Sequence, residues 1–268
     1  MTLTRFAPAP TGYLHLGHVA NAVWVWGLAG REAGRVLLRI EDHDRTRCRP
    51  EYEAAILDDL DWLGFPADLG PARQSDSDAP YLVALEQLRA DGRVYGCACT
   101  RATFRTWAEG HGRAWSGPGC PGGCRERGAP ETTIRVLLGG GSEAWEDRLA
   151  GPCEGAVAGG GDPIVRDRDG GWSYGFSVVV DDLRQGVDLV IRGRDLLDAT
   201  PDQIRLGRLL GREAPPTFAH HALILRPDGS KLSKADGATG IRELRAAGRT
   251  AADLIAEASV ATGFALGS

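Results

Sequence analysis

Two histidines, His15 and His18, stand three residues apart in the segment from Pro8 to His18. On a helix this spacing places both imidazoles on one face, and Gly17 between them lets a flat ring lie close to the backbone. A helix N-terminus adds unpaired N–H groups and a partial positive charge. The pattern therefore predicts a site where imidazoles contact the phosphates of a nucleotide. Either histidine alone would more often be a surface or capping residue.

Two lysines, Lys231 and Lys234, fall within four residues of each other, whereas every other basic residue of the 31 is an arginine. A lysine ammonium is a compact point charge on a flexible stem, which a planar guanidinium does not reproduce. We interpret the pair as functional. Chance placement, or a solvated surface turn after residues 227–229, is the alternative.

Four of the six cysteines lie between positions 97 and 124. Four thiolates in two knuckles can fill the tetrahedral shell of a structural Zn²⁺, which leaves no open position for catalysis. His111 is a competing ligand, and a set of free thiols is the alternative. The candidate metal ligands are Cys97, Cys99, Cys120 and Cys124.

The composition bounds the class of protein. A chain of 268 residues with 43% hydrophobic residues has room for one large α/β domain, or one with an inserted module. No apolar run is long enough to span a bilayer, and the first residues do not have the pattern of a signal peptide. We expect a cytoplasmic protein with no membrane partner. The net charge of −5 argues against a nucleic-acid-coating protein but leaves room for a local basic surface.

The N-terminal pattern of strand, turn, helix and strand, at residues 2–6, 19–33 and 35–40, predicts a βαβ unit and hence a parallel sheet. Ligands of such sheets bind at the carboxyl ends of the strands, which is where the histidine segment begins. Helices are expected at residues 50–61 and 80–90, the second with Asp78 as its N-cap.

The region from 94 to 161 is glycine-rich and broken, and we interpret it as an inserted zinc-binding subdomain. It would divide the chain into parts at 1–93, 94–161, 162–235 and 236–268. Beyond it, residues 164–165, 172–180, 187–191 and 221–225 are expected as strands, with a turn or short helix at 181–182. A capping box at residues 200–203 predicts a helix to Gly211, and Thr250 is expected to cap a final helix.

Three segments carry a resemblance to a known family: Arg5–Gly12 with His15–His18, Arg39–Arg45, and Lys231–Ala235. They resemble the HIGH, RIEDTDR and KMSKS signatures of class I aminoacyl-tRNA synthetases of the glutamyl branch. The resemblance implies a Rossmann-type catalytic core that uses ATP, with Mg²⁺, to form an aminoacyl-adenylate. It further implies catalytic roles for His15, His18, Lys231 and Lys234, and ATP contacts from His15, Gly17, His18 and Lys234. Leu232 and Ala235 depart from the signature.

The same resemblance implies a pocket for L-glutamate. Arg5 and Arg192 would bind carboxylates, Glu41 the ammonium group, and Tyr174 would donate a hydrogen bond. The family usually has serine where Ala9 stands, so one hydrogen bond is missing. Taken singly, each residue also has an ordinary structural explanation. The implied pocket residues are Arg5, Phe6, Ala7, Pro8, Ala9, Glu41, Tyr174 and Arg192.

Residues 236–268 are too few to build an anticodon-binding domain, so the chain is similar to the short subgroup of glutamyl-Q tRNA(Asp) synthetases. The subgroup implies glutamate activation without tRNA, transfer to queuosine at the wobble position of tRNA(Asp), and a zinc site in which Cys120 stands where a tyrosine is common. We expect a monomer whose zinc region is unfolded without metal. Arginines that could contact RNA phosphates are Arg101, Arg105, Arg113, Arg125 and Arg127.

Three alternatives remain open. The chain could be a truncated ligase that charges a tRNA 3′ end, a non-catalytic nucleotide- or RNA-binding module, or an adenylating ligase that uses no RNA. The intact histidines, Glu41 and the lysine pair argue against the non-catalytic module. Whether label from glutamate reaches RNA separates the others.

Overall fold

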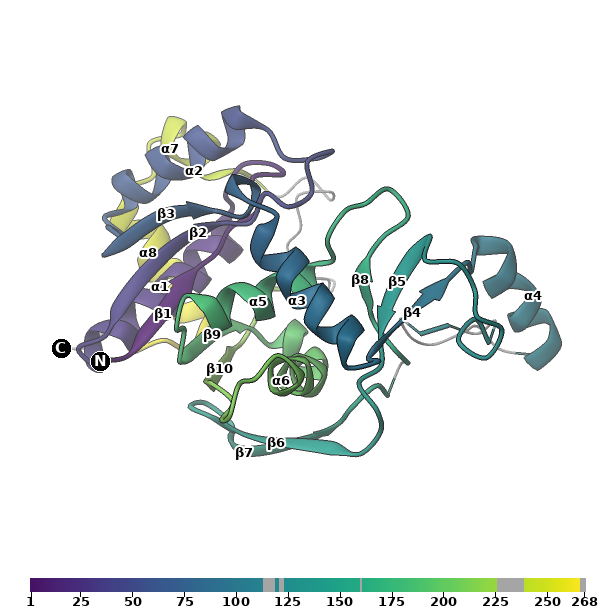
Figure 1. Cartoon of the computed structure of the whole chain (residues 1–268). Helices are drawn as coiled ribbons and strands as arrows, with labels where there is room; N and C mark the ends of the chain where they lie inside the picture. Colours follow the sequence, from purple (N-terminus) through teal and green to yellow (C-terminus); the bar gives the residue numbers. More distant parts are fainter. Residues whose placement is uncertain (113–118, 121–122, 160, 226–238, 266–268) are drawn as a thin grey trace.

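The computed structural model describes residues 1–112, 119–120, 123–159, 161–225 and 239–265 (Figure 1). The core has two sheets whose edge strands run side by side. The first has the parallel order β1-β2-β3, and the second has the order β7-β6-β10-β9, parallel except at β7. The edge strands β1 and β9 are joined where Leu3 O accepts from Asp188 N at 3.1 Å. The strands are β1 (Leu3–Phe6), β2 (Arg35–Ile40), β3 (Leu69–Arg73), β6 (Ser142–Asp147), β7 (Gly151–Ala156), β9 (Leu189–Gly193) and β10 (Thr217–His221).

Helix α1 (Leu16–Arg31) lies between this layer and helix α8 (Ala251–Thr262). Its buried residues run nearly all round the helix, as its apolar sequence predicts, and Trp24 Nε1 donates to Thr262 Oγ1 at 2.9 Å. Helix α2 (Pro50–Leu63) and helix α7 (Ile241–Ala246) cover the same half of the molecule (Figure 1). The first core therefore fixes the helix that begins in the histidine segment.

A second core lies under helices α3 (Ala79–Ala90), α5 (Tyr174–Arg184) and α6 (Thr200–Leu209). Two 3₁₀ turns precede α3 and α6: η1 (Gln74–Asp76) and η2 (Arg194–Ala199). In Figure 1 these helices occupy the centre of the molecule, between the β1–β3 sheet and the outer module.

The outer module consists of an antiparallel sheet and one helix, and it projects away from the β1–β3 sheet (Figure 1). Its elements are β4 (Val94–Cys97), β5 (Thr133–Val136), β8 (Ile164–Arg166) and α4 (Arg101–His111). Strands β6 and β7 also fall within the predicted insertion at 94–161, but they belong to the core sheet, where β6 pairs with β10 and β7 pairs with β6. The predicted domain boundaries stay a prediction.

The structure confirms the predicted fold class, because β1 with β2, β2 with β3, and β9 with β10 form parallel pairs joined by helices. The final helix begins at its predicted cap, where Thr250 Oγ1 accepts from Asp253 N at 3.2 Å, and it ends at Gly263. Among the described helices, none combines the length and the apolarity needed to cross a bilayer.

The segment 172–180 was predicted as a strand, and this is wrong, because residues Tyr174–Arg184 form helix α5, which also contains the predicted turn at 181–182. Ser173 caps the helix by accepting from Phe176 N at 3.4 Å. Every residue from Phe176 to Asp182 is buried. A helix that is buried on all sides shows the same continuous apolar run as a buried strand, so hydrophobicity alone does not separate the two.

Three local predictions also need correction. Thr200 does not cap α6: it is the first helical residue, and its hydroxyl donates to Leu196 O at 3.2 Å. The strand expected at 221–225 lies at Thr217–His221. Asp78 occupies the N-cap position of α3, but its carboxylate accepts from Trp172 Nε1 instead of a helical N–H.

One buried carboxylate in α2 makes the stability of this fold depend on pH. The side chain of Asp59 is fully buried, its two oxygens have no hydrogen-bond partner among the described residues, and Arg242 Nε of α7 lies 4.0 Å away. Burial raises the pKa of Asp59 to about 6. The folded chain thus binds this proton more tightly than the unfolded chain, so the free energy of unfolding falls as pH rises from about 4 to about 6.

We expect Asp59→Asn to raise the free energy of unfolding at pH 7.5 by about 1–2 kcal/mol, and to leave it unchanged near pH 3.5, below the pKa of the unfolded carboxyl. Urea unfolding at the two pH values measures this. The control is Asp58→Asn, whose half-exposed side chain pairs with Arg242 and Arg245 and should change stability by about 0.5 kcal/mol or less at both pH values. An Asp59→Asn variant no more stable than the parent at pH 7.5 would contradict the interpretation.

Candidate active site

A cavity of about 480 Å³ opens at the carboxyl ends of β1, β2 and β9, beside the N-terminus of α1. A neighbouring cavity of about 300 Å³ shares part of its wall and adds Phe6 and Pro8. The structure therefore brings most of the predicted nucleotide and amino-acid residues together. Lys231 and Lys234 lie outside the described residues. The predicted residues that line the larger cavity are Arg5, Ala7, Ala9, His15, Gly17, His18, Glu41, Tyr174 and Arg192.

The two histidines form the N-terminal cap of α1. His15 Nδ1 accepts from Gly17 N at 3.1 Å, and His18 Nδ1 accepts from His15 N at 3.1 Å. Their ring centroids are 4.0 Å apart. Because each Nδ1 accepts a hydrogen bond, the proton of each ring is on Nε2, which is then a donor. A Cβ at position 17 would lie 3.0 Å from His15 Cε1, so a larger residue there would require the imidazole to shift.

Arg5, at the end of β1, is held by a carboxylate from α5. Its Nε donates to Asp182 Oδ1 at 3.0 Å, and its Nη1 donates to Ile191 O at 3.2 Å. The same Asp182 Oδ1 accepts from Arg39 Nη2 at 2.7 Å. Burial alone would raise the pKa of Asp182, but the two guanidiniums outweigh it and hold that pKa below its ordinary value. Asp182 is therefore ionised and shared between two strands.

Glu41 follows β2 and is 6% exposed. Arg39 Nε lies 3.6 Å from its Oε1, yet that oxygen has no hydrogen bond within the described part of the chain. Burial raises the pKa of Glu41. A buried acceptor without a donor is costly, so a cationic ligand group placed here would satisfy the oxygen and favour the ionised form.

Arg192, at the end of β9, forms hydrogen bonds with neutral groups, Tyr174 among them. Among the described residues it forms no ion pair with a carboxylate, and burial lowers its pKa to about 10. The guanidinium therefore stays charged at neutral pH and lacks a direct counterion, which favours an anionic ligand. Its hydrogen-bond acceptors are His220 Nε2 (3.0 Å), Gln203 Oε1 (2.5 Å), Thr200 Oγ1 (2.8 Å) and Leu196 O (3.4 Å).

Tyr174 begins α5 at the wall of both cavities. Burial, followed by the nearby Glu41 carboxylate, raises the pKa of its hydroxyl. The phenol therefore stays protonated and can donate a hydrogen bond. The cavity thus presents two guanidiniums, one carboxylate and one phenol, next to imidazoles at a helix N-terminus. This set can bind an amino acid that carries a second carboxylate, beside a phosphate.

Sequence reasoning missed the residues that hold these groups in place. Arg39 stands among the apolar residues 36–40 of β2, and a charge in that position is a signal of a buried ion pair. Asp147 and His220 are also buried, with Oδ2 and Nδ1 2.6 Å apart. No local pattern marks them, because their partners are distant in the sequence.

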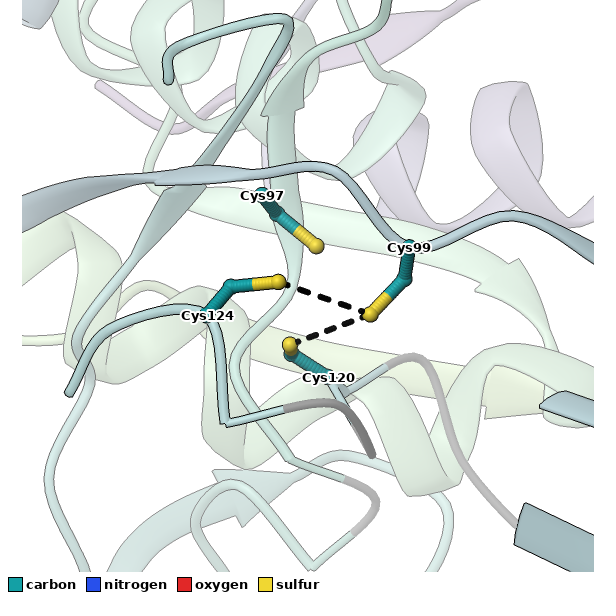
Figure 2. A group of neighbouring side chains, drawn as sticks. All are labelled: Cys97, Cys99, Cys120 and Cys124. Atoms are coloured by element: carbon teal, nitrogen blue, oxygen red, sulfur yellow. Dashed lines mark hydrogen bonds between the residues drawn. The ribbon is translucent and has the colours of Figure 1, made fainter. Parts of the chain in front are cut away.

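The four cysteines of the outer module form a single cluster (Figure 2). Their Sγ atoms all lie within 4.8 Å of one another, with Cys99 Sγ 3.3 Å from Cys120 Sγ and 3.6 Å from Cys124 Sγ. Cys97 ends β4, Cys99 precedes α4, and the other two lie in the following loop. Four thiolates around one tetrahedral metal ion have sulfur–sulfur distances of about 3.8 Å, so the donor set fits a metal.

Comparison with known proteins finds one family over most of the chain. The model of "tRNA synthetases class I (E and Q), catalytic domain" matches residues 1–116 and 123–258. A glutamyl-Q tRNA(Asp) synthetase of Symbiobacterium thermophilum is 41% identical, and the match covers 98% of this chain and 87% of that protein. One of Rhodobacter capsulatus is 40% identical, with coverage of 94% and 98%.

Longer proteins match over part of their length. A glutamate–tRNA ligase of Synechococcus sp. (strain JA-3-3Ab) is 39% identical over 91% of this chain but 53% of its own length. The solved glutamate tRNA ligase of Elizabethkingia meningosepticum, in complex with its amino acid, has a TM-score of 0.76 and 28% identity, covering 90% of this chain and 57% of that one. This chain thus spans about half the length of those ligases.

Proposed function

This chain belongs to the class I glutamyl and glutaminyl (E and Q) tRNA synthetases and is a ligase, and from that premise we propose that it activates L-glutamate with ATP, without tRNA, and transfers the glutamyl group to queuosine at the wobble position of tRNA(Asp). The observation that carries the proposal is the pairing of a preformed dicarboxylate pocket with a match along 98% of a glutamyl-Q tRNA(Asp) synthetase. Its monomeric state and cytoplasmic location stay predictions.

The pocket supports glutamate as the amino acid. Arg5 and Arg192 each offer a buried guanidinium for a carboxylate, and Glu41 offers an unsatisfied oxygen for the ammonium group. Glutamine would present an amide where glutamate has its second carboxylate. That amide would leave one buried guanidinium without a counterion, and this costs binding energy.

In the activation step, a carboxylate oxygen of glutamate attacks the α-phosphorus of ATP. The bond from that phosphorus to the bridging oxygen breaks, and pyrophosphate leaves with the electron pair. We propose that the Nε2–H groups of His15 and His18 and the N-terminus of α1 donate to phosphoryl oxygens, where negative charge grows; the Nδ1 capping bonds, which leave the ring protons on Nε2, support this. Lys234 and Lys231 are proposed to contact the triphosphate, which binds with Mg²⁺.

In the transfer step, a nucleophile of the acceptor attacks the acyl carbon of the adenylate. It loses its proton, and AMP leaves. Two relatives named glutamyl-Q tRNA(Asp) synthetase align with 87% and 98% of their own length, whereas the glutamate–tRNA ligase aligns with about half. This difference supports queuosine of tRNA(Asp) as the acceptor.

We propose that the cysteine cluster holds one structural Zn²⁺. Cys97 and Cys124 are almost fully buried, and the four sulfurs, which come from a strand end and loops, lie within 4.8 Å of one another. A metal shell of four thiolates has no open position, so the ion would hold β4, the start of α4 and the following loop together. It would take no part in the reaction.

The acceptor is tested by incubating the chain with labelled glutamate, ATP and Mg²⁺. Four RNA conditions are compared: no RNA, tRNA(Asp) with queuosine, tRNA(Asp) without queuosine, and queuosine-bearing tRNA(Asp) that lacks its 3′-terminal adenosine. We expect glutamate-dependent pyrophosphate exchange without RNA. We also expect label on the two queuosine-bearing RNAs and none on the queuosine-free tRNA. Label on the queuosine-free tRNA, with none on the RNA that lacks its terminal adenosine, would show 3′-end charging instead. Exchange that strictly requires tRNA would contradict activation without tRNA.

The zinc site is tested on the purified chain by elemental analysis and limited proteolysis. We expect one zinc ion per chain and, after treatment with a chelator, new cleavage between residues 97 and 136 that added Zn²⁺ reverses. Cys99→Ser should lose the metal, whereas the control Cys153→Ser, a cysteine outside the cluster, should keep it. A digestion pattern that the chelator leaves unchanged would count against the site.

A further inference from the structure

We propose that Asp147 and His220 act as a positioning pair that holds the Arg192 guanidinium in place for a ligand carboxylate while leaving its charge unneutralised. The inference rests on the proposed function, because it takes Arg192 as the ligand of a glutamate carboxylate. It adds two residues, from β6 and β10, that do not line either cavity described above.

The contacts form a continuous chain across three neighbouring strands. Arg192 and His220 are direct partners in the β9–β10 register, and Asp147 of β6 pairs with Phe218 of β10. Arg192 Nε donates to His220 Nε2 at 3.0 Å, and His220 Nδ1 lies 2.6 Å from Asp147 Oδ2. The side chains of His220 and Asp147 are 2% and 0% exposed. The three groups are therefore fixed by the sheet itself.

The geometry sets the tautomer of His220. An arginine has donors alone, so Nε2 must be the unprotonated nitrogen that accepts from Arg192. The ring proton is then on Nδ1, which donates to Asp147. The opposite tautomer would place an imidazole N–H against the guanidinium N–H. The orientation of the Asp147 carboxylate is fixed, because its Oδ1 accepts from Leu149 N at 2.8 Å and from Ala150 N at 3.1 Å.

The charges explain why a neutral ring separates Asp147 from Arg192. Burial lowers the pKa of His220, so its imidazole stays neutral. Burial would raise the pKa of Asp147, but the bond from His220 and the backbone N–H groups outweigh it and hold the pKa below its ordinary value. A carboxylate in direct contact would neutralise the guanidinium, as Asp182 does for Arg5. The imidazole fixes the direction of Arg192 Nε without that neutralisation.

Two substitutions of His220 separate a role in positioning Arg192 from a role in packing alone. In His220→Gln the amide can reach the place of Nε2 and accept from Arg192, whereas in His220→Asn it reaches the place of Nδ1 and leaves Arg192 Nε without its acceptor. Calorimetry on the full chain gives Kd for glutamate, for glutamine, which lacks the side-chain carboxylate, and for glutamate α-amide, which lacks the α-carboxylate. Kd for ATP and thermal unfolding serve as controls.

We expect His220→Asn to weaken glutamate binding by about tenfold or more, and to reduce the preference for glutamate over one of the two amides by a similar factor. His220→Gln should stay within about threefold of the parent, and ATP binding should stay unchanged in both. A merely structural role would weaken all three amino acids equally in His220→Asn, and that result would overturn the proposal. A parent chain that fails to bind glutamate would instead overturn the proposed function.

The parent protein offers a test that needs no substitution. Long-range ¹H–¹⁵N correlation of the histidine rings reports which nitrogen carries the proton. The proposal expects the Nδ1–H tautomer at His220 at neutral pH. An Nε2–H tautomer or an imidazolium ring would overturn it, even if the variants failed to fold.

Discussion

The site depends on one buried carboxylate. Asp182 of α5 accepts from Arg5 of β1 and from Arg39 of β2, so it ties two strands to a helix that follows them by more than a hundred residues in the sequence. Two guanidiniums cannot be buried side by side without a counterion, because the desolvation of each charge has to be offset. Helix α5 must therefore dock with Asp182 against these strands. The same docking places Tyr174, at the start of that helix, on the wall of the cavity.

The buried guanidiniums in and beside the pocket differ in their hydrogen-bond partners. Arg5 and Arg39 share Asp182, while Arg192 is oriented by neutral groups, with Asp147 set back behind an imidazole. Glu41 has an oxygen without a hydrogen bond within the described residues. Arg192 thus lacks a carboxylate partner and Glu41 lacks a donor among the described residues, and glutamate can supply a carboxylate to the first and an ammonium group to the second, with its other carboxylate beside Arg5. The histidine cap of α1 lies on the wall of the same cavity, so the amino acid and the phosphates can meet there.

Local sequence patterns predicted the first βαβ unit, the final helix and the clustering of the cysteines, because each depends on residues close in the chain or on one kind of side chain. They failed at α5, since an apolar run buried on all sides has no period that separates helix from strand. The resemblance supplied Arg5, Glu41, Tyr174 and Arg192. It assigned no role to Arg39, Asp147 or His220, whose importance depends on contacts between distant segments. Lys231 and Lys234 lie outside the described residues, and their roles stay a prediction.

The central claim is that Asp182 holds the Arg5 guanidinium in place for glutamate, together with the buried Arg39 beside it. The most direct measurement is the calorimetric Kd for glutamate of Asp182→Asn, compared with the parent and with Asp169→Asn, a control in an exposed turn. Because the amide leaves two buried guanidiniums without their shared charge, we expect a free energy of unfolding lower by about 3 kcal/mol and glutamate binding weaker by about tenfold or more, with parental binding in the control. An Asp182→Asn variant that binds glutamate as tightly as the parent would contradict the account.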